Sequence, residues 1–224
     1  MSLDALFLSL RLALTVASIL LIIALPLAYW LAFTSWRGKF LLESIVALPL
    51  VLPPTVLGFY ALIALGPRGF LGRVWQQAFG HSLAFTFPGL VVASLFYSLP
   101  FAVQPLLSSF ESLDRRLLDA SSILGAGRAR TLFRVILPLS WPGLITAGVL
   151  SFAHTLGEFG VVLMVGGNLP GVTRTVSIDI YDRVQALDYA GAHRTALLLL
   201  LVSFVVLSIV YGINRRMWSP WAKK

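Results

Sequence analysis

The chain has 224 residues, of which 58% are hydrophobic and 12% are charged, and its formal net charge is +8. A soluble globular domain carries about 25% charged residues, so this composition excludes that class, while the length suits a single membrane domain over residues 1–224. The basic residues cluster at the ends of apolar runs, which favours anchoring of membrane loops over nucleic-acid binding, and the absence of cysteine excludes disulfides and thiolate metal sites.

Five stretches of the sequence are apolar enough to cross a membrane. Each lies between charged residues and provides the roughly 20 apolar residues that about 30 Å of hydrocarbon requires. In chain order they are Leu12 to Arg37, Ser44 to Pro67, Leu83 to Phe110, Val135 to Thr173, and Thr195 to Asn214. We therefore expect an all-α membrane protein with five transmembrane helices.

The distribution of Lys and Arg over the loops predicts the orientation of these helices. Eleven of the seventeen basic residues fall on the side that carries the C-terminus and residues 111–138, and six fall on the other side. Because cytoplasmic loops carry an excess of Lys and Arg, we expect the N-terminus outside and the C-terminus inside.

Three prolines stand close together in the second predicted helix. Pro49, Pro53 and Pro54 each remove a backbone donor and interrupt the helical hydrogen bonds. One interpretation is a kinked helix whose freed carbonyls are satisfied by neighbouring helices. The alternative is that broken backbone lines a water-filled path, as discontinuous helices do in transporters, and the three prolines are candidate residues of such a path or its gate.

Residues 111–138 form the most strongly charged block of the chain and lie between two predicted spans. Apolar residues recur at helical spacing from Leu113 to Leu124, a Gly-Ala-Gly turn follows at 125–127, and a second stretch runs from Arg130 to Leu137. The charges of the block are Glu111, Asp114, Arg115, Arg116, Asp119, Arg128, Arg130 and Arg134. A polar segment of this size cannot lie within lipid, so we expect it to stand in water and to meet a partner there.

The fourth predicted span contains one charged residue, Glu158, within the sequence Leu156-Gly-Glu-Phe-Gly160. A carboxylate within a membrane helix costs at least about 2.5–3.5 kcal/mol, so it should face a cavity or a partner, while Gly157 and Gly160 allow another backbone to approach closely. The plainer alternative is a buried glutamate that fixes helix packing through hydrogen bonds, for instance with His154 one turn earlier. We favour a place on the pathway or its gate for Gly157, Glu158 and Gly160, because ionisable groups within membranes are functional by default.

The link between the fourth and fifth predicted spans, residues 166–194, carries an amphipathic pattern that predicts a short interfacial helix. Its apolar residues three or four apart are Val176, Ile180, Val184 and Leu187. Arg174, Arg183 and Arg194 could focus anions at an outer mouth. Solvated loop charges are the commoner explanation of such arginines, and we favour it.

No pattern in the sequence predicts catalysis by this chain. A phosphate-cradling Walker loop does not occur, so the chain is not expected to hydrolyse nucleotide itself. The three histidines lack metal-ligand spacing, apart from His154 and Glu158, which stand four residues apart. We expect no metal and no cofactor. Any active transport needs a separate subunit that supplies the energy.

The charged block resembles the cytoplasmic EAA signature of ABC-importer permeases. That signature reads Glu-Ala-Ala, three residues, Gly, nine residues and Ile-x-Leu-Pro, and this chain has Asp119-Ala-Ser121, Gly125 and Val135-Ile-Leu-Pro138 at the same spacing. It departs from the family by Asp for Glu, Ser for the second Ala and Val for Ile. The resemblance implies a coupling helix seated in a cleft of an ATPase subunit. The residues that would form its docking surface are Asp119, Ala120, Ser121, Gly125 and Arg128.

Residues 48–72, 154–160 and 168–181 are similar to the molybdate-transport permease family. The resemblance implies the ABC importer permease fold, in a multi-pass protein of the bacterial inner membrane that imports molybdate by alternating access. It also implies a homodimer of this chain with two cytoplasmic ABC ATPase subunits and an extracytoplasmic oxyanion-binding protein. A sulfate, thiosulfate or tungstate ABC permease is the main alternative, and an ion-coupled secondary transporter is a more distant one.

A dianionic substrate constrains the part that Glu158 can play. An ionised carboxylate facing the anion would repel it, so direct ligation by Glu158 is not expected. We expect Glu158 to hold the geometry of a gate or to be paired.

Overall fold

The computed structural model describes residues 3–218, and this part of the chain contains helices and connecting loops but no strand. The elements are α1 (Leu3–Phe33), α2 (Lys39–Val51), α3 (Pro54–Leu65), α4 (Phe70–Phe79), α5 (Phe87–Glu111), α6 (Arg115–Ile123), α7 (Arg128–Thr131), the π-helical turn η1 (Leu132–Ile136), α8 (Leu137–Leu139), α9 (Trp141–Gly157), α10 (Gly160–Gly166), α11 (Val176–Gln185) and α12 (Tyr189–Trp218). The all-α class expected from the composition is confirmed.

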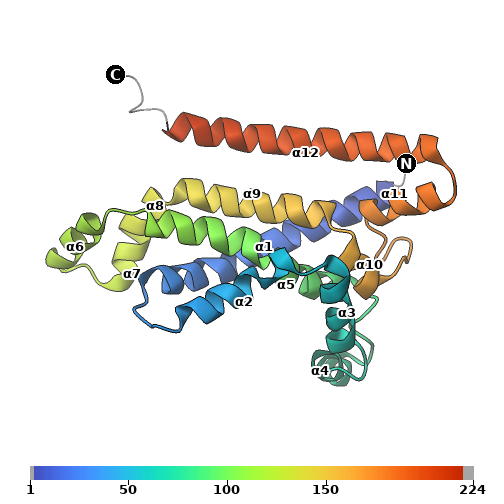
Figure 1. The fold of residues 1–224 in the computed structure, drawn as a ribbon, viewed down its shortest axis with the longest axis horizontal. Coiled ribbons are helices and arrows are strands. Elements are labelled where there is room, and N and C mark those ends of the chain that lie inside the picture. The colour runs from blue at the N-terminus through green and yellow to red at the C-terminus, as the bar shows by residue number, and fades with distance from the viewer. Residues whose placement is uncertain (1–2, 219–224) are drawn as a thin grey trace.

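Helices α1, α5 and α9 lie side by side and enclose the main hydrophobic core (Figure 1). The buried face of α1 repeats every three or four residues through Leu12, Val16, Leu20, Ala24, Ala28 and Leu31. Its alanines let neighbouring helices approach closely, which favours van der Waals contact in the absence of a hydrophobic driving force within lipid. The first and third predicted spans therefore correspond to single long helices, α1 and α5.

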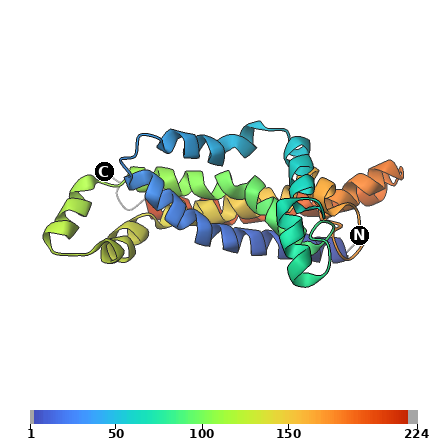
Figure 2. The ribbon, with the colours of Figure 1, turned by 90° about the horizontal axis from the view of Figure 1, so that it is seen from below.

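The second predicted span is not one helix, and this corrects the expectation from the sequence. The chain bends by 112° between α2 and α3, at Leu52 and Pro53 (Figure 2). Both residues precede a proline, which disfavours helical backbone, and both are extended, with ψ of 139° and 138°. Pro54 then begins α3, where its fixed φ suits the first helical turn. Pro49 stays within α2.

The fourth predicted span is also broken, and Glu158 is at the break instead of within a helix. Helix α9 ends at Gly157, Glu158 has extended backbone with ψ of 134°, and α10 begins at Gly160. At the other end of α9, residues 128–139 and 141–157 are bent by 74°.

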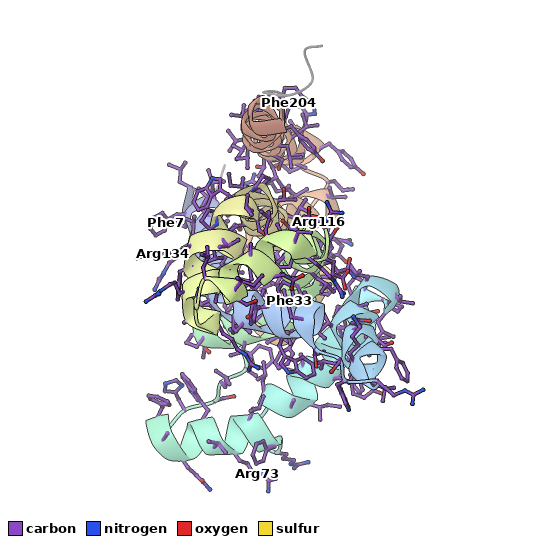
Figure 3. The ribbon with its side chains drawn as sticks, turned by 90° about the vertical axis from the view of Figure 1, so that its left-hand side faces the viewer. Phe7, Phe33, Arg73, Arg116, Arg134 and Phe204 are labelled. Carbon is purple, nitrogen blue, oxygen red and sulfur yellow. The ribbon has the colours of Figure 1, made fainter. Side chains whose placement is uncertain are left out.

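Among residues 3–218, three helices, α1, α5 and α12, are long and apolar enough to cross a membrane, and the number rises to five if each bent pair counts as one span. Helix α12 runs beside the bundle, on the side opposite to α4 (Figure 3). Only 11% of the residues in its most apolar stretch, within Tyr189–Ser208, are buried. The segment α6–α7 lies at one end of the molecule, whereas α11 and the start of α1 lie at the other (Figure 1). This arrangement fits loops on opposite sides of a membrane. Which end faces the cytoplasm stays a prediction from the loop charges, and two of those charges, Lys223 and Lys224, lie outside the described residues.

Helix α4 was not expected from the sequence. It is strongly amphipathic, with exposed apolar side chains at Phe70, Val74 and Phe79. Gly72 permits the tight turn from α3, because a Cβ there would lie 1.9 Å from the carbonyl oxygen of Gly66. Together, α3 and α4 form an arm that projects from the bundle (Figure 3).

Candidate translocation cleft and coupling segment

The two helix breaks meet at one cleft of about 580 Å³. Its lining comprises Pro54, Thr55, Tyr97, Ala153, His154, Gly157, Glu158, Phe159 and Gly160. The structure thus brings Pro54 together with Gly157, Glu158 and Gly160, three candidate pathway residues that follow it by about a hundred positions in the sequence. Pro49 and Pro53 are not among the lining residues; Pro53 lies in the break itself, and Pro49 lies one turn before it within α2.

Gly160 is required for the contact between the two breaks. A Cβ at position 160 would lie 2.7 Å from the Cβ of Pro54, which is closer than real side-chain carbons approach. Gly58 packs in the same way against Met164, where a Cβ would lie 2.8 Å away. The expectation that glycine near Glu158 allows close backbone approach therefore applies to Gly160, whereas nothing lies within 4 Å of a Cβ built at Gly157.

A row of buried hydroxyl groups joins α5 to α9 beside this cleft. Ser94 Oγ donates to Glu158 Oε2 at 2.8 Å, and Ser98 Oγ lies 2.9 Å from His154 Nδ1 and 2.8 Å from Thr155 Oγ1. Ser94 and Ser98 are fully buried. Sequence reasoning missed both serines, although two hydroxyls one helical turn apart in an apolar run are a recognisable signal of a polar helix contact.

Glu158 is 4% exposed, and its Oε1 has no hydrogen-bond partner among residues 3–218. None of the ion pairs in that part of the chain involves Glu158. The suggested hydrogen bond between Glu158 and His154 is wrong, because each side chain bonds a different serine of α5.

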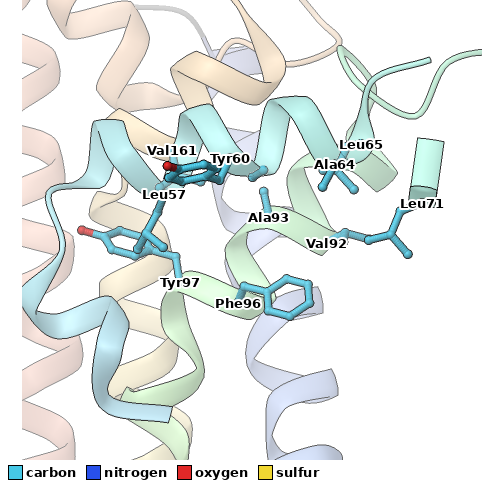
Figure 4. Close-up of a pocket in the computed structure, with 11 residues that line it drawn as sticks. Leu57, Tyr60, Ala64, Leu65, Leu71, Val92, Ala93, Phe96, Tyr97 and Val161 are labelled. Carbon is cyan, nitrogen blue, oxygen red and sulfur yellow. The ribbon is translucent and has the colours of Figure 1, made fainter. Parts of the chain in front are cut away.

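His154 is held on several sides. Its ring stacks on Phe101 with centroids 3.9 Å apart at 22°, and the ring of Tyr97 lies 4.6 Å away. Tyr97 also borders a second pocket, of about 240 Å³, whose walls are almost entirely apolar and come mainly from α3 and α5 (Figure 4). Tyr97 therefore separates a polar cleft from an apolar one.

Two of the three arginines Arg174, Arg183 and Arg194 are paired with carboxylates. Arg174 contacts Asp182 at 3.4 Å, and Arg183 contacts Asp179 at 2.9 Å and Asp188 at 3.1 Å. The hydrogen bond from Arg183 to Asp179 raises the pKa of that guanidinium above its ordinary value. These pairs join the 168–174 loop to α11 and α11 to the start of α12. Pairing offsets part of the positive charge that would otherwise focus anions. The predicted interfacial helix corresponds to α11.

The charged block 111–138 folds as a helix, a turn and a second helical stretch. Asp114 caps α6 by accepting a hydrogen bond from the backbone N–H of Arg116 at 2.9 Å. Gly125 follows α6 with φ of 73°, a backbone conformation that favours glycine. Ser121 Oγ lies 2.8 Å from Thr131 Oγ1 and thereby joins α6 to α7.

A groove of about 350 Å³ runs between the two halves of this block. It is lined by Leu117, Ala120, Ser121, Leu124, Ala126, Arg130, Arg134 and Val135. Of the candidate coupling residues, Ala120 and Ser121 line the groove, while Asp119, Gly125 and Arg128 lie outside it. Ile123 and Leu124 are each 84% exposed, which is unusual for large apolar side chains in a charged segment and is typical of a surface that a partner covers.

Residues 24–219 match the family described as "Binding-protein-dependent transport system inner membrane component". The chain belongs to this family. It is a multi-pass inner-membrane permease, and the matched region includes both the cleft and residues 111–138.

Known relatives of the permease cover nearly its whole length. It is 53% identical over 213 residues to the molybdenum transport system permease protein ModB of Azotobacter vinelandii, covering 95% of this chain and 94% of that protein. It is 38% identical over 203 residues to ModB of Escherichia coli strain K12, covering 88% of this chain and 89% of that protein. A probable sulfate transport system permease protein, cysT, of Chlorella vulgaris is 34% identical, covering 77% of this chain and 65% of that protein.

Solved transporters share the fold of the permease. A bacterial alginate ABC transporter in complex with its pentasaccharide-bound periplasmic protein matches with a TM-score of 0.77 at 18% identity, covering 96% of this chain and 79% of that one. The MetNI methionine ABC transporter in an inward-facing conformation matches with a TM-score of 0.75 at 16% identity, covering 96% and 95%. The ABC importer permease fold is thus confirmed.

Proposed function

We propose that this permease is the membrane subunit of an ATP-driven importer of molybdate. The observation that carries the proposal is the 53% identity to ModB of Azotobacter vinelandii over 95% of the chain. Import of a dianion against a negative-inside potential costs about 4.6 kcal/mol per 100 mV, so a passive channel would exclude the ion and a motor is needed.

The motor is a separate pair of cytoplasmic ABC ATPase subunits, which dock on the 111–138 segment. The exposed Ile123 and Leu124, together with the groove beside α6, supply an apolar surface flanked by arginines for this docking. Asp119, Ala120, Ser121, Gly125 and Arg128 form or shape that surface. The orientation that this requires is N-terminus outside and C-terminus inside, with five spans in which each bent helix pair counts as one.

The cleft at the two helix breaks is the translocation path or its gate. Broken helices line substrate paths in membrane transporters because irregular backbone is tolerated there only where it faces water or protein. Pro53, Pro54, Gly157, Glu158 and Gly160 shape this cleft, and Pro49 bends the helix that leads to it. The cleft is open on one side in a single chain, and a second copy of the permease completes it, so the importer contains a homodimer.

An extracytoplasmic oxyanion-binding protein delivers the substrate to the outer end, where α11 and the ion-paired 168–188 region lie. The test is reconstitution of the permease in proteoliposomes with an ABC ATPase and an oxyanion-binding protein from the same organism. We expect ATP hydrolysis stimulated by the loaded binding protein, together with accumulation of molybdate. Uptake that depends on neither the ATPase nor the binding protein would contradict the proposal and favour an ion-coupled carrier.

A sulfate or thiosulfate importer is the second candidate, supported by the similarity to the cysT protein. Parallel uptake measurements with molybdate, tungstate, sulfate and thiosulfate separate these substrates. Preference for sulfate at equal concentrations would overturn the assignment of molybdate while leaving the ABC permease class intact.

A further inference from the structure

We infer that the cleft contains a transient binding site for a tetrahedral oxyanion, in which His154 donates a hydrogen bond to the anion and Ser98 positions the His154 ring. The inference rests on the proposed function, because it names a contact that the imported anion makes on its way through the permease. It assigns a role to two residues that neither the sequence pattern nor the proposed gate requires.

The polar inventory of the cleft is small. The side chains that line it and carry a polar group are those of Thr55, Tyr97, His154 and Glu158, and none of the lining residues is Lys or Arg. Hydrogen-bond donors, not fixed positive charges, must therefore recognise an anion there. Neutral donors suit a path, since an anion that binds strongly would not leave.

The hydrogen bonds around Ser98 indicate which nitrogen of His154 carries the ring proton. Ser98 Oγ contacts His154 Nδ1 at 2.9 Å and Thr155 Oγ1 at 2.8 Å. The direction in which Thr155 donates to Ser98, and Ser98 donates to Nδ1, uses both hydroxyl protons; the reverse direction leaves the proton of the buried Thr155 hydroxyl without an acceptor. The favoured direction places the ring proton on Nε2, which has no hydrogen-bond partner among residues 3–218.

The aromatic neighbours hold the ring in this position. Phe101 stacks on it with centroids 3.9 Å apart, and Tyr97 packs at 4.6 Å. One edge of the imidazole is thus bonded to α5 and its ring is held by two aromatic side chains, so its Nε2–H is a preorganised donor. A preorganised donor binds without the entropic cost of ordering a flexible side chain.

Glu158 limits the strength of the site. Its carboxyl group bonds Ser94 through Oε2 and is 4% exposed, so it contributes little surface to the cleft. When ionised, it repels an anion held at His154 and keeps the occupancy brief. A donor and a nearby carboxylate together give the weak, passing contact that conduction requires.

Two substitutions at position 154 separate the two ring nitrogens. In His154→Asn the amide can occupy the place of Nδ1 and keep the contact with Ser98, but nothing replaces Nε2. In His154→Gln the longer side chain can carry an amide donor to the place of Nε2. His193→Asn is the matched control, because His193 is an exposed histidine at the start of α12, away from the cleft.

The measurement is molybdate uptake and ATP hydrolysis in the same proteoliposomes, which contain the permease with its ATPase and binding protein. We expect His154→Asn to lower the amount of molybdate imported per ATP hydrolysed by about 10-fold to 100-fold, the range expected for a hydrogen bond to a charged group. His154→Gln should restore most of the uptake, and His193→Asn should match the unsubstituted permease. Retained ATP hydrolysis stimulated by the binding protein shows that the variants are folded and still engage both the ATPase and the binding protein.

A second measurement needs no substitution. Diethyl pyrocarbonate modifies imidazole nitrogens, and peptide mass spectrometry reports each histidine of the unsubstituted permease–ATPase complex separately. We expect millimolar tungstate or molybdate to slow modification of His154 while His81 and His193 react at unchanged rates.

The outcomes distinguish this inference from the function on which it rests. Uptake per ATP by His154→Asn equal to that of the unsubstituted permease, or equal modification of His154 with and without oxyanion, overturns the site and leaves the importer intact. Failure of the unsubstituted permease to import any oxyanion with its ATPase overturns the proposed function and the site with it.

Discussion

Ser94 on α5 donates a hydrogen bond of 2.8 Å to Glu158, which lies in the break between the end of α9 and the start of α10. Sixty-four positions separate the two residues in the sequence, and both are buried. The bond is the one that the buried carboxyl group forms within the described part of the chain. It therefore holds the break between α9 and α10 in place beside α5, which is continuous at Ser94.

Ser94→Ala should destabilise the permease. Removing the hydroxyl leaves a buried carboxyl group unsatisfied, which costs about 1–3 kcal/mol. We expect a lower unfolding temperature in detergent and weaker coupling between ATP hydrolysis and uptake. Ser44→Ala is the control, because the Ser44 hydroxyl bonds the carbonyl of Phe40 at an exposed position and its loss should change little. Equal unfolding temperatures for both variants would contradict the role given to the Ser94–Glu158 contact.

Glu158→Gln keeps the shape of the side chain and an acceptor for Ser94, so assembly should be retained. Transport should nevertheless change, because an amide can neither ionise nor exchange a proton beside the cleft. Glu158→Ala removes the contact with α5 as well and should lower both uptake and coupling. If Glu158→Ala left uptake rates and ATP hydrolysis unaltered, Glu158 would not belong to the pathway or its gate.

Gly160→Ala should disturb the contact between the two helix breaks. The new Cβ would clash with Pro54 at 2.7 Å, and overpacking of this kind costs about 1–3 kcal/mol. Gly157→Ala provides a matched comparison three residues away, since nothing lies within 4 Å of the added Cβ. Thermal unfolding of the two variants in detergent measures the difference, and a Gly157→Ala variant as unstable as Gly160→Ala would argue against close packing at Pro54.

Gly125→Leu should uncouple the permease without preventing its insertion. A side chain at φ of 73° costs about 1–2 kcal/mol and would alter the turn that presents α6. Gly127→Ala is the control, because Gly127 has φ of −68° and open space around it. We expect ATP hydrolysis stimulated by the binding protein to fall in Gly125→Leu alone. Normal uptake by that variant would count against docking of the ATPase at this segment.

The turn between α11 and α12 should open at acidic pH. The backbone N–H of Gly191 and the guanidinium of Arg183 lower the pKa of Asp188 below its ordinary value of about 3.9. A carboxyl group with a lowered folded-state pKa stabilises the turn above the ordinary pKa, and this stabilisation is lost as the pH falls through the lower value. A spin label at Ala186 should gain mobility over that range, and Asp188→Asn should show the mobile spectrum at pH 7. An immobile label in Asp188→Asn would exclude this contribution.

Much of the architecture was predictable because it depends on local patterns. Charge-free runs located α1, α5 and α12, the spacing of Val176 and Ile180 located α11, and Gly125 marked the end of α6. The breaks were harder to predict, because proline predicts an interruption but not its angle. The 112° bend at Pro53 also depends on packing of α3 against α10, with Gly58 and Gly160 at the contact.

The cleft was predictable only in part. Pro54 and Glu158 were identified one by one, but their meeting depends on tertiary structure. The partners of Glu158 and His154 could not be derived, because Ser94 and Ser98 lie on another helix. Their spacing of one helical turn indicates a polar helix contact but not which residues they bond. Helix α4 was not predicted, because its ten residues are too few to cross a membrane and include Arg73 and two glutamines.

The most direct test of the central claim is the sidedness of residue 123, because coupling requires α6 to lie in the cytoplasm against the ATPase. The chain lacks cysteine, so Ile123→Cys, at a side chain 84% exposed, introduces a single thiol. Val172→Cys, 47% exposed at the opposite end, is the reference for the outer side. An impermeant maleimide should label position 172 in spheroplasts and position 123 only in inverted vesicles, with bound ATPase protecting position 123. Labelling of position 123 from outside would contradict the account.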